Sequence, residues 1–482
     1  MGSTKIGKIV SGLGWTFGER ILAQGVSFLV SIVLARILAP SEFGIISLIL
    51  IFINISNVFV SNGFGESLIQ KKNANIKDYS TVFWCSFFVS LVLVGIIWIC
   101  APIISDFYDN PYLIWPLRIL SLKLILASIN SIQQAYISKH LMFRKMFFAT
   151  LLGTIVSAFG GIALAYLGFG VWALVAQYLI NSTIDTLALL VTVPWRPKLT
   201  FSMQSAKKLI GYGWKITGAA LINELYVQSR SLIIGKVYST VDLAFYNKGN
   251  MFPQVIMTNI NTAVNKVFFP VMVNTNDDKT QLKRIARNAI TGIALITFPL
   301  MTFLMVAADK IILLLLTEKW AFSIPFMRTL CLFWIVQPVQ TANWQVLKAS
   351  GRSDLCLKLE IIKKVIGVGL VLSTMMISVQ ALAWSNVAFA LISMVVNMIP
   401  NRKLINYSIF EQILDLLPII LLSFGTAGIA WCISFISMPL IVSIILEAVV
   451  CFGVYGLIVV GYLKIKNPSL INNIISKIKR GK

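Results

Sequence analysis

The chain has 482 residues, of which 57% are hydrophobic and only 12% are charged, and its formal net charge is +23. A soluble domain carries roughly twice that share of charged residues, so the composition excludes a water-soluble protein and predicts one that lipid surrounds. The excess of lysine and arginine is typical of the cytoplasmic loops of membrane proteins, and it therefore does not indicate a nucleic-acid partner.

Apolar runs long enough to cross a hydrocarbon core recur from one end of the chain to the other. They predict an all-α integral membrane protein with about fourteen transmembrane helices and short connections. We expect no cleavable signal peptide before the first run. The predicted spans are residues 12–36, 42–68, 79–104, 113–138, 146–167, 170–193, 206–234, 242–272, 286–308, 323–349, 358–378, 380–399, 412–434 and 438–462.

The distribution of positive charge predicts the orientation of these spans. Most of the 41 lysines and arginines lie in the two tails and in the connections that follow even-numbered spans, as do Lys71 with Lys72 and Lys283 with Arg284. Because cytoplasmic loops carry the positive excess, both termini are expected in the cytoplasm.

An internal repeat divides the chain into two halves. Gly12-Leu-Gly-Trp15 reappears as Gly211-Tyr-Gly-Trp214, and Glu42-Phe-Gly44 is matched by Asp242-Leu-Ala244, both at an offset of about 200 residues. Span 1 thus matches span 7, and span 2 matches span 8, so the halves are related by a pseudo-two-fold axis along the membrane normal, with the site between them near the midplane. The predicted organisation is an N-terminal lobe over 1–200, a C-terminal lobe over 201–403, and two extra helices with a basic tail over 404–482.

Basic residues inside the apolar spans indicate an aqueous cavity. A charge at the bilayer centre costs on the order of 2.5–3.5 kcal/mol. Residues near span ends can instead extend to the membrane surface, as we expect for Arg328 and as an alternative for Lys348 and Lys266. For the deeper Arg20, Lys123 and Arg230, a water-filled cavity is the better interpretation. The basic residues inside spans are Arg20, Arg118, Lys123, Lys215, Arg230, Lys248, Lys266, Arg328 and Lys348.

Polar side chains at helical spacing form stripes on the same elements of each repeat, spans 1, 2 and 4 and spans 7, 8 and 10. Hydrogen bonding between packed helices is the alternative explanation and could account for one or two amides per helix. In the first half the stripes are Arg20 and Gln24; Asn54, Asn57 and Ser61; and Lys123, Asn130 and Gln134. In the second half they are Lys215, Asn223, Tyr226 and Arg230; Asn247, Asn250, Gln254, Thr258, Asn261 and Asn265; and Gln337, Gln340, Trp344 and Lys348.

The predicted cavity is large, basic, and rich in amides and aromatic rings. Amides and aromatic faces suit sugars, whereas arginine and lysine suit phosphate, so the cavity is predicted to bind a phosphorylated saccharide. We expect Arg20, Lys215, Arg230 and Lys248 to converge on one pocket for the phosphate. The predicted substrate-binding residues are Arg20, Gln24, Asn57, Lys123, Asn130, Lys215, Asn223, Tyr226, Arg230, Lys248, Asn250, Gln254, Asn261, Lys266, Gln340 and Trp344.

Acidic residues inside the spans are fewer, and they either form charge pairs in the bundle or bind a coupling proton or Na⁺. Glu447 belongs to this group, and the candidates for ion coupling are Glu19, Glu66, Asp185 and Glu224. Beyond such an ion, no cofactor, metal or disulfide is expected, because the six cysteines and one histidine show no ligand spacing. The chain has neither a catalytic constellation nor an ATP-binding P-loop motif, so we expect a carrier and not an enzyme.

Several motifs resemble those of a known family. Leu34-Ala-Arg-Ile-Leu-Ala-Pro-Ser-Glu-Phe-Gly44, followed by Gly63-Phe-Gly65 and Gln70-Lys-Lys72, resembles the opening of the polysaccharide transport family of the multidrug/oligosaccharidyl-lipid/polysaccharide (MOP) flippase superfamily. That family includes Wzx-like exporters and exporters of teichuronic and colanic acid. Further matches in the same order are Ser80-Thr-Val-Phe-Trp84, Phe169-Gly-Val-Trp-Ala-Leu-Val175, Tyr246-Asn-Lys248, Phe269-Pro270 leading to Asp277-Asp278, and Leu347-Lys-Ala-Ser-Gly-Arg352.

The resemblance implies two lobes of six helices, two extra C-terminal helices and alternating access. It also implies transport of an undecaprenyl-diphosphate-linked oligosaccharide from the cytoplasmic to the outer leaflet of a bacterial inner membrane, with a polysaccharide polymerase as a further partner. Two alternatives stay open: an ion-coupled exporter of drugs or small cations from the same superfamily, and a membrane enzyme that acts on polyprenyl saccharides.

Overall fold

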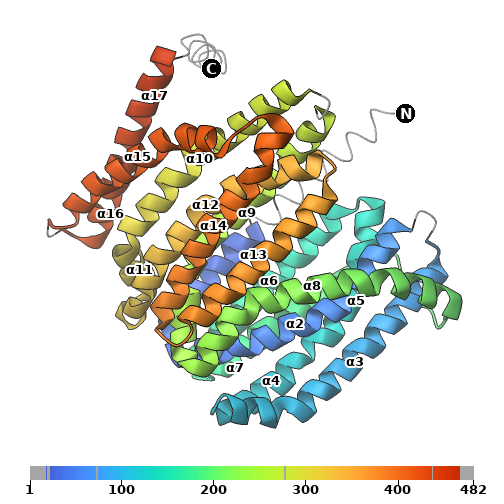
Figure 1. Cartoon of the computed structure of the whole chain (residues 1–482). Helices are drawn as coiled ribbons and strands as arrows, with labels where there is room; N and C mark the ends of the chain where they lie inside the picture. Colours follow the sequence, from blue (N-terminus) through green and yellow to red (C-terminus); the bar gives the residue numbers. More distant parts are fainter. Residues whose placement is uncertain (1–17, 19–21, 72–73, 276–277, 437, 467–482) are drawn as a thin grey trace, which may run out of the picture. The chain divides into compact units, whose positions relative to one another are not determined.

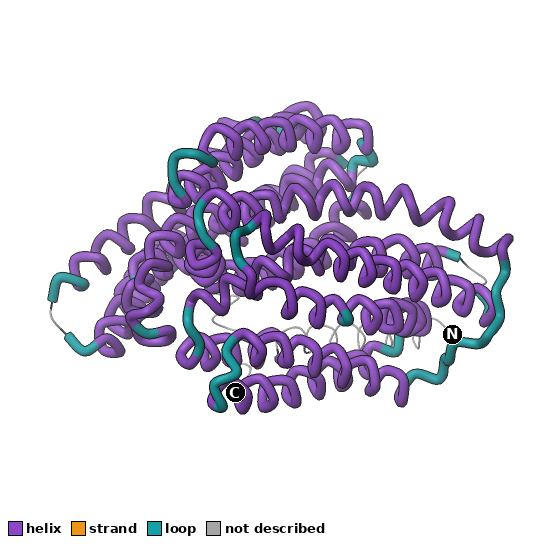
Figure 2. The backbone as a smooth tube through the Cα atoms, turned by 90° about the horizontal axis from the view of Figure 1, so that it is seen from below, coloured by secondary structure: helices purple, strands orange, loops and turns teal. Residues whose placement is uncertain are grey.

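The computed structural model describes residues 18, 22–71, 74–275, 278–436 and 438–466. Every regular element within these ranges is a helix (Figure 2), which confirms the all-α prediction. The chain divides into two compact units, Met1–Asn247 and Lys248–Lys482, and each is described separately below.

The first unit is a bundle of long helices joined by short turns (Figure 1). It includes the helix Leu22–Ile37, and α9 (Thr240–Asn274) begins in this unit and continues into the second. Its other elements are α2 (Pro40–Gln70), α3 (Ile76–Phe107), the 3₁₀ turn η1 (Pro111–Leu113), α4 (Ile114–Ser121), α5 (Lys123–His140), α6 (Phe143–Tyr166), α7 (Val171–Thr192) and α8 (Met203–Val237).

The second unit has the same character but contains more interruptions, because α10 breaks at Ala307 and a π-helical stretch separates α16 from α17. Its elements are α10 (Lys279–Val306), α11 (Ala308–Leu316), the 3₁₀ stretch η2 (Glu318–Ser323), α12 (Ile324–Ala349), α13 (Ser353–Thr374), α14 (Val379–Ile405), α15 (Ile409–Ile433), α16 (Leu440–Ala448), the π-helical η3 (Val449–Val454) and α17 (Tyr455–Lys466).

Ten helical segments of the described chain are long and apolar enough to cross a membrane, so the protein is a multi-pass membrane protein. The long helices α8, α9 and α13 coincide with predicted spans 7, 8 and 11 but do not belong to these ten. They carry the lysines, arginines and amides that lower their hydropathy. The total of about fourteen crossings therefore stays a prediction.

The internal repeat has a structural counterpart at two helix starts. The helix Leu22–Ile37 is followed by α2, which begins at Pro40, and α8 ends at Val237 just before α9 begins at Thr240. An acid stands at the third position of both following helices. Glu42 accepts a hydrogen bond from the Ala39 N–H at 2.7 Å, and Asp242 accepts one from the Ser239 hydroxyl at 2.6 Å. Both carboxylates thus cap a helix N-terminus, where negative charge is favourable.

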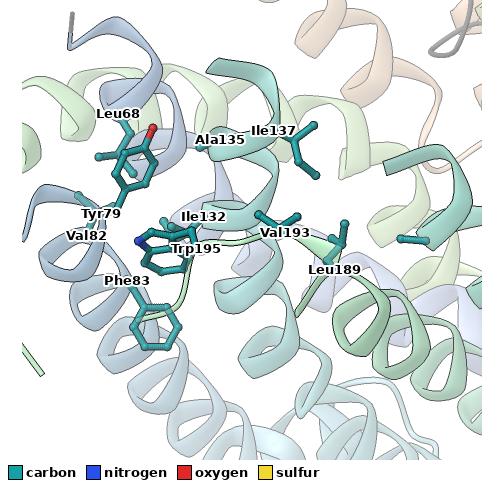
Figure 3. Close-up of a cluster of buried hydrophobic side chains, with 11 residues drawn as sticks. Leu68, Tyr79, Val82, Phe83, Ile132, Ala135, Ile137, Leu189, Val193 and Trp195 are labelled. Atoms are coloured by element: carbon teal, nitrogen blue, oxygen red, sulfur yellow. The ribbon is translucent and has the colours of Figure 1, made fainter. Parts of the chain in front are cut away.

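The connector between α7 and α8 is fixed along the start of α3 (Figure 3). Trp195 of the connector is buried against the rings of Tyr79 and Phe83, at centroid distances of 6.0 and 6.1 Å. The backbone N–H of Lys198 donates to the Ser80 hydroxyl at 3.1 Å. The connector therefore holds the N-terminal end of α8 within the first unit.

Close backbone packing also holds α8 and the start of α9 against α2. A side chain at Gly44 would overlap the Thr240 carbonyl group, and one at Gly235 would come within 2.9 Å of the Leu48 side chain. The structure thus groups α8 with the helices of the first half. The lobes 1–200, 201–403 and 404–482 rest on the repeat and stay a prediction.

Candidate functional site

In the first unit, Arg230 is a buried cation packed on an aromatic ring. Its side chain is 6% exposed, and the guanidinium carbon lies 5.8 Å from the centre of the Tyr226 ring, one turn earlier on α8. A cation over an aromatic face gains electrostatic stabilisation that increases when water is excluded. Elsewhere on α8, Asn223 is exposed and Glu224 accepts a hydrogen bond from Gln228 at 2.8 Å.

Lys123 lies at an irregularity that the sequence does not predict. The predicted span 113–138 is divided at Leu122, so Lys123 begins α5, and its ammonium nitrogen is 5.3 Å from the centre of the Tyr178 ring of α7. Lys123 therefore places a cation beside an aromatic ring where α5 meets α7. This is the combination expected for a phosphorylated sugar.

A candidate cavity residue and a candidate ion-coupling residue contact each other farther along the same pair of helices. The Asn130 amide donates to the Asp185 carboxylate at 3.1 Å. On α2, Asn57 accepts from the Ser61 hydroxyl at 2.9 Å within its own stripe. Asn130 thus orients the Asp185 carboxylate.

In the second unit, part of the predicted amide stripe on α9 bonds directly to α12. The Trp334 indole N–H donates to Asn250 at 2.8 Å, and the Thr341 hydroxyl donates to Asn261 at 3.2 Å. Gln345 donates to Asn265 one turn farther on. The residue numbers of these pairs increase together along α9 and α12, so the two helices are parallel. We call this row of hydrogen bonds the polar ladder.

The ladder gives part of the amide stripe a structural role, the alternative that the sequence left open. Gln254 differs from the ladder residues because it is exposed, and the bond described for its side chain comes from Asn250 of the same helix, at 3.1 Å. Gln340 of α12 donates to the Ala390 carbonyl of α14 at 2.7 Å and is 9% exposed. Gln254 therefore keeps more of its polar surface accessible to a ligand than Gln340 does.

Lys248 is the most deeply buried of the predicted cations in the second unit. It is 5% exposed, and its nitrogen lies 5.6 Å from the centre of the Trp320 ring. The next residue, Gly249, lets α9 approach η2 and α12, since a Cβ there would be 2.8 Å from the Met327 nitrogen. Lys248 is thus fixed over Trp320 by the close approach of these elements, and Lys266, farther along α9, is half-buried.

Trp344 leads to a cation that the polar stripes miss. The Lys363 ammonium lies 4.4 Å from the centre of the Trp344 ring and 2.6 Å from the Glu360 carboxylate. Lys363 was not predicted because it lies in the first turns of span 358–378, where a lysine normally reaches the membrane surface. An acid one turn before it, inside an apolar segment, is the sequence signal that could have found it.

The remaining predicted residues are described only in part. Arg20 and Glu19 lie outside the described residues, and Glu66 and Lys215 lie in helices but outside the described side chains; Gln24 is half-buried on the helix Leu22–Ile37. Arg230 and Lys248 belong to different units. The convergence of Arg20, Lys215, Arg230 and Lys248 on one pocket therefore stays a prediction.

Comparisons with known proteins give a consistent result. Residues 33–325 match the model of the family described as "Polysaccharide biosynthesis protein". The teichuronic acid biosynthesis protein TuaB of Bacillus subtilis (strain 168) is 26% identical over 358 residues, which cover 73% of this chain and 73% of that protein. The lipopolysaccharide biosynthesis protein WzxC of Escherichia coli (strain K12) is 26% identical over 367 residues, covering 74% and 73%.

Solved structures resemble the chain over most of its length. The lipid II flippase MurJ in an inward closed conformation gives a TM-score of 0.76 at 13% identity and covers 96% of this chain and 100% of its own. An inward-facing multidrug resistance MATE transporter of the MOP superfamily gives 0.62 at 16% identity, covering 80% and 94%. At these identities the likeness shows a shared fold.

Proposed function

Because the chain belongs to the polysaccharide biosynthesis protein family, whose model matches residues 33–325, we propose that it is a flippase for a lipid-linked oligosaccharide. The observation that carries this proposal is the set of cations held over aromatic rings, with Arg230 and Lys248 both nearly buried. A buried cation is retained at a cost, and an anionic cargo gives it a function.

The cargo would be an undecaprenyl-diphosphate-linked oligosaccharide that moves from the cytoplasmic to the outer leaflet of a bacterial inner membrane by alternating access. The arginine and lysine side chains would bind the diphosphate, since a guanidinium forms paired hydrogen bonds with phosphate oxygens. Exposed amides such as Gln254 and aromatic faces would contact the sugars, while the lipid chain stays in the bilayer.

Topology, coupling and partners complete the proposal. Both termini would lie in the cytoplasm, and a polysaccharide polymerase would receive the translocated oligosaccharide. Of the candidates for binding a coupling proton or Na⁺, Asp185 has the clearest geometry, because the Asn130 amide orients its carboxylate. The chain would act as a carrier and not as an enzyme.

Transport by the purified protein tests this function. The full chain is reconstituted in liposomes with a fluorescent polyprenyl-diphosphate saccharide, and the fraction accessible to an external glycosidase is followed. Wild-type protein should accelerate translocation. Arg230→Ala should slow it roughly 10- to 100-fold, the effect of losing one hydrogen bond to a charged group.

Arg328→Ala is the matched control, because the Arg328 side chain is 43% exposed and pairs with Asp309 at 3.4 Å. It should leave translocation close to wild type. If no polyprenyl-diphosphate saccharide moves while small organic cations are exported, the chain is a drug or cation exporter, and if the purified protein cleaves or extends the saccharide, it is an enzyme.

A further inference from the structure

A second cationic and aromatic cluster lies where α12 ends and α13 begins. Trp344 stands on the last turns of α12, and Lys363 of α13 places its ammonium 4.4 Å from the centre of that ring. The same ammonium bonds to Glu360 at 2.6 Å. Lys363 thus contacts both an aromatic ring and a carboxylate.

The three side chains differ in their access to solvent. The Lys363 side chain is 10% exposed, whereas the Glu360 side chain is 42% exposed, and Trp344 is half-buried. Because helical side chains lean toward the N-terminus, Lys363 points back along α13 toward Glu360 and the turn that follows α12. The carboxylate is therefore the more accessible partner of a cation that remains in place.

Further charges surround the cluster. Lys348 is exposed on the last turn of α12. Burial raises the pKa of the Cys356 thiol, while Lys348 and Lys363 act on that thiol in the opposite direction and Glu360 in the same one. The two lysines, Glu360 and Asp354 therefore all lie within electrostatic reach of Cys356. Because Asp354 is paired with Arg352 at 2.8 Å, these five charged side chains together carry one net positive charge.

Glu360 satisfies Lys363 only in part. An ammonium has three N–H donors, and ion pairs three residues apart on a helix stabilise it only weakly. A phosphate group offers more acceptor oxygens and more charge than a carboxylate, so it can replace Glu360 at Lys363. The adjacent indole face suits the apolar face of a sugar ring.

We propose that Trp344, Lys363 and Lys348 form a docking subsite for the phosphosugar head group of the substrate, in which Glu360 occupies Lys363 until the phosphate displaces it. The subsite rests on the proposed function and deepens it. In the proposed topology this end of α12 faces the cytoplasm, so the subsite would bind the head group before translocation.

Cys356 provides a native reporter for this subsite. A full-length variant keeps Cys356 while Cys85, Cys100, Cys331, Cys432 and Cys451 are replaced by alanine or serine. Its rate of reaction with a water-soluble maleimide is measured against increasing polyprenyl-diphosphate saccharide in vesicles of neutral lipid. The bound head group should slow labelling several-fold, with a half-saturating concentration that measures docking.

Two substitutions should change that concentration in opposite directions. Lys363→Gln removes the cation and should raise it at least tenfold, whereas Glu360→Gln removes the competitor and should lower it. If the Lys363–Glu360 ion pair were purely structural, both substitutions would raise the half-saturating concentration. Lys363→Arg should bind close to wild type, which shows that a loss in Lys363→Gln reflects charge and not misfolding.

Lys358→Gln is the matched control, because this lysine is exposed on the same helix, and it should leave the half-saturating concentration unchanged. Trp344→Leu should weaken protection by the saccharide lipid more than by sugar-free polyprenyl diphosphate. Equal protection by phosphatidylglycerol vesicles alone would overturn the proposal in favour of a lipid head-group site.

Transport measured in parallel distinguishes failure of the subsite proposal from failure of the proposed flippase function. Wild-type translocation without protection of Cys356, or without opposite shifts in Lys363→Gln and Glu360→Gln, overturns the subsite and leaves the flippase intact. Absence of translocation by the wild-type protein overturns the flippase itself.

Discussion

The Lys310 ammonium forms an ion pair with the Glu447 carboxylate, and the two residues are 7% and 0% exposed. This pair joins α11 to α16. At the start of α10, Lys283 pairs with Glu411 of α15 at 3.1 Å, and Arg287 pairs with Asp415. The two groups of pairs are separated by roughly 35–40 Å of helix. The two predicted extra helices correspond to α15 and to α16 with α17. Ion pairs thus join α15 to the start of α10 and α16 to α11.

Breaking the Lys310–Glu447 pair should destabilise the protein strongly. Glu447→Ala leaves a buried ammonium without its counter-ion, which typically costs about 3–5 kcal/mol. We expect a clear fall in the thermal unfolding midpoint of the protein in detergent, followed by tryptophan fluorescence.

Replacing both partners of this pair by apolar residues should be much less harmful than removing one, because no uncompensated charge remains. Lys310→Met with Glu447→Leu should therefore recover most of the lost stability. Arg328→Gln breaks an exposed pair and should cost at most about 1 kcal/mol. Strictly additive effects of Lys310→Met and Glu447→Leu would contradict the importance of the pair.

Tyr407 should contribute stability that does not vary between pH 6 and pH 9. Its hydroxyl donates to Asp415 at 2.8 Å, and burial, followed by this hydrogen bond, raises the pKa of the phenol. A group whose pKa is raised on folding stabilises below its unfolded pKa, which for tyrosine is about 10. The contribution should be lost as the pH rises beyond that value.

The measurement for Tyr407 compares the unfolding midpoints of wild type and Tyr407→Phe. The substitution should cost about 1.5–3 kcal/mol, the value of a hydrogen bond to a charged group, with the same difference at pH 6 and pH 9. A difference that decreases between these two pH values would show that the phenol loses its proton earlier than the structure indicates.

The polar ladder between α9 and α12 should affect stability more than transport. A double-mutant cycle of Asn261→Ala and Thr341→Val should give a coupling of about 0.6 kcal/mol, and no more than about 1.7, as in other membrane bundles. Gln254→Ala should show the reverse pattern, with slower transport and an unchanged midpoint, because Gln254 is exposed. Equal transport losses in Asn261→Ala and Gln254→Ala would place both side chains at the substrate.

The sequence predicts the helices well because a transmembrane span is a local property: enough apolar residues must follow one another. The helix starts at Pro40 and Thr240 are similarly local, since each has its capping acid at the third position. The break at Leu122 has no such signal, because no proline or glycine marks it.

The sequence does not predict which residues of other helices a polar side chain contacts. Asn250 and Gln254 share one stripe, yet the Trp334 indole donates to Asn250 while Gln254 is exposed. Sequence spacing places both on one helix face but does not state what packs against that face. For Lys363, the spacing from Glu360 is a sequence signal for the ion pair, but the contact with Trp344 on the neighbouring helix is visible only in the structure.

Gly249 should not tolerate even one added methyl group. A Cβ at this position would be 2.8 Å from the Met327 nitrogen and 2.8 Å from the Ser323 carbonyl oxygen, both of which belong to the backbone. Since backbone atoms cannot move aside as a flexible side chain does, α9 would have to shift away from η2 and α12. That shift would move Lys248 off the Trp320 ring, so Gly249→Ala should lower both the unfolding midpoint and transport.

Gly292→Ala is the matched control, because its Cβ would meet no atom within 4 Å, and alanine is favoured over glycine in a helix by roughly 0.5–1 kcal/mol. The two substitutions should therefore change the midpoint in opposite directions, and a wild-type midpoint in Gly249→Ala would show that the elements are less closely packed.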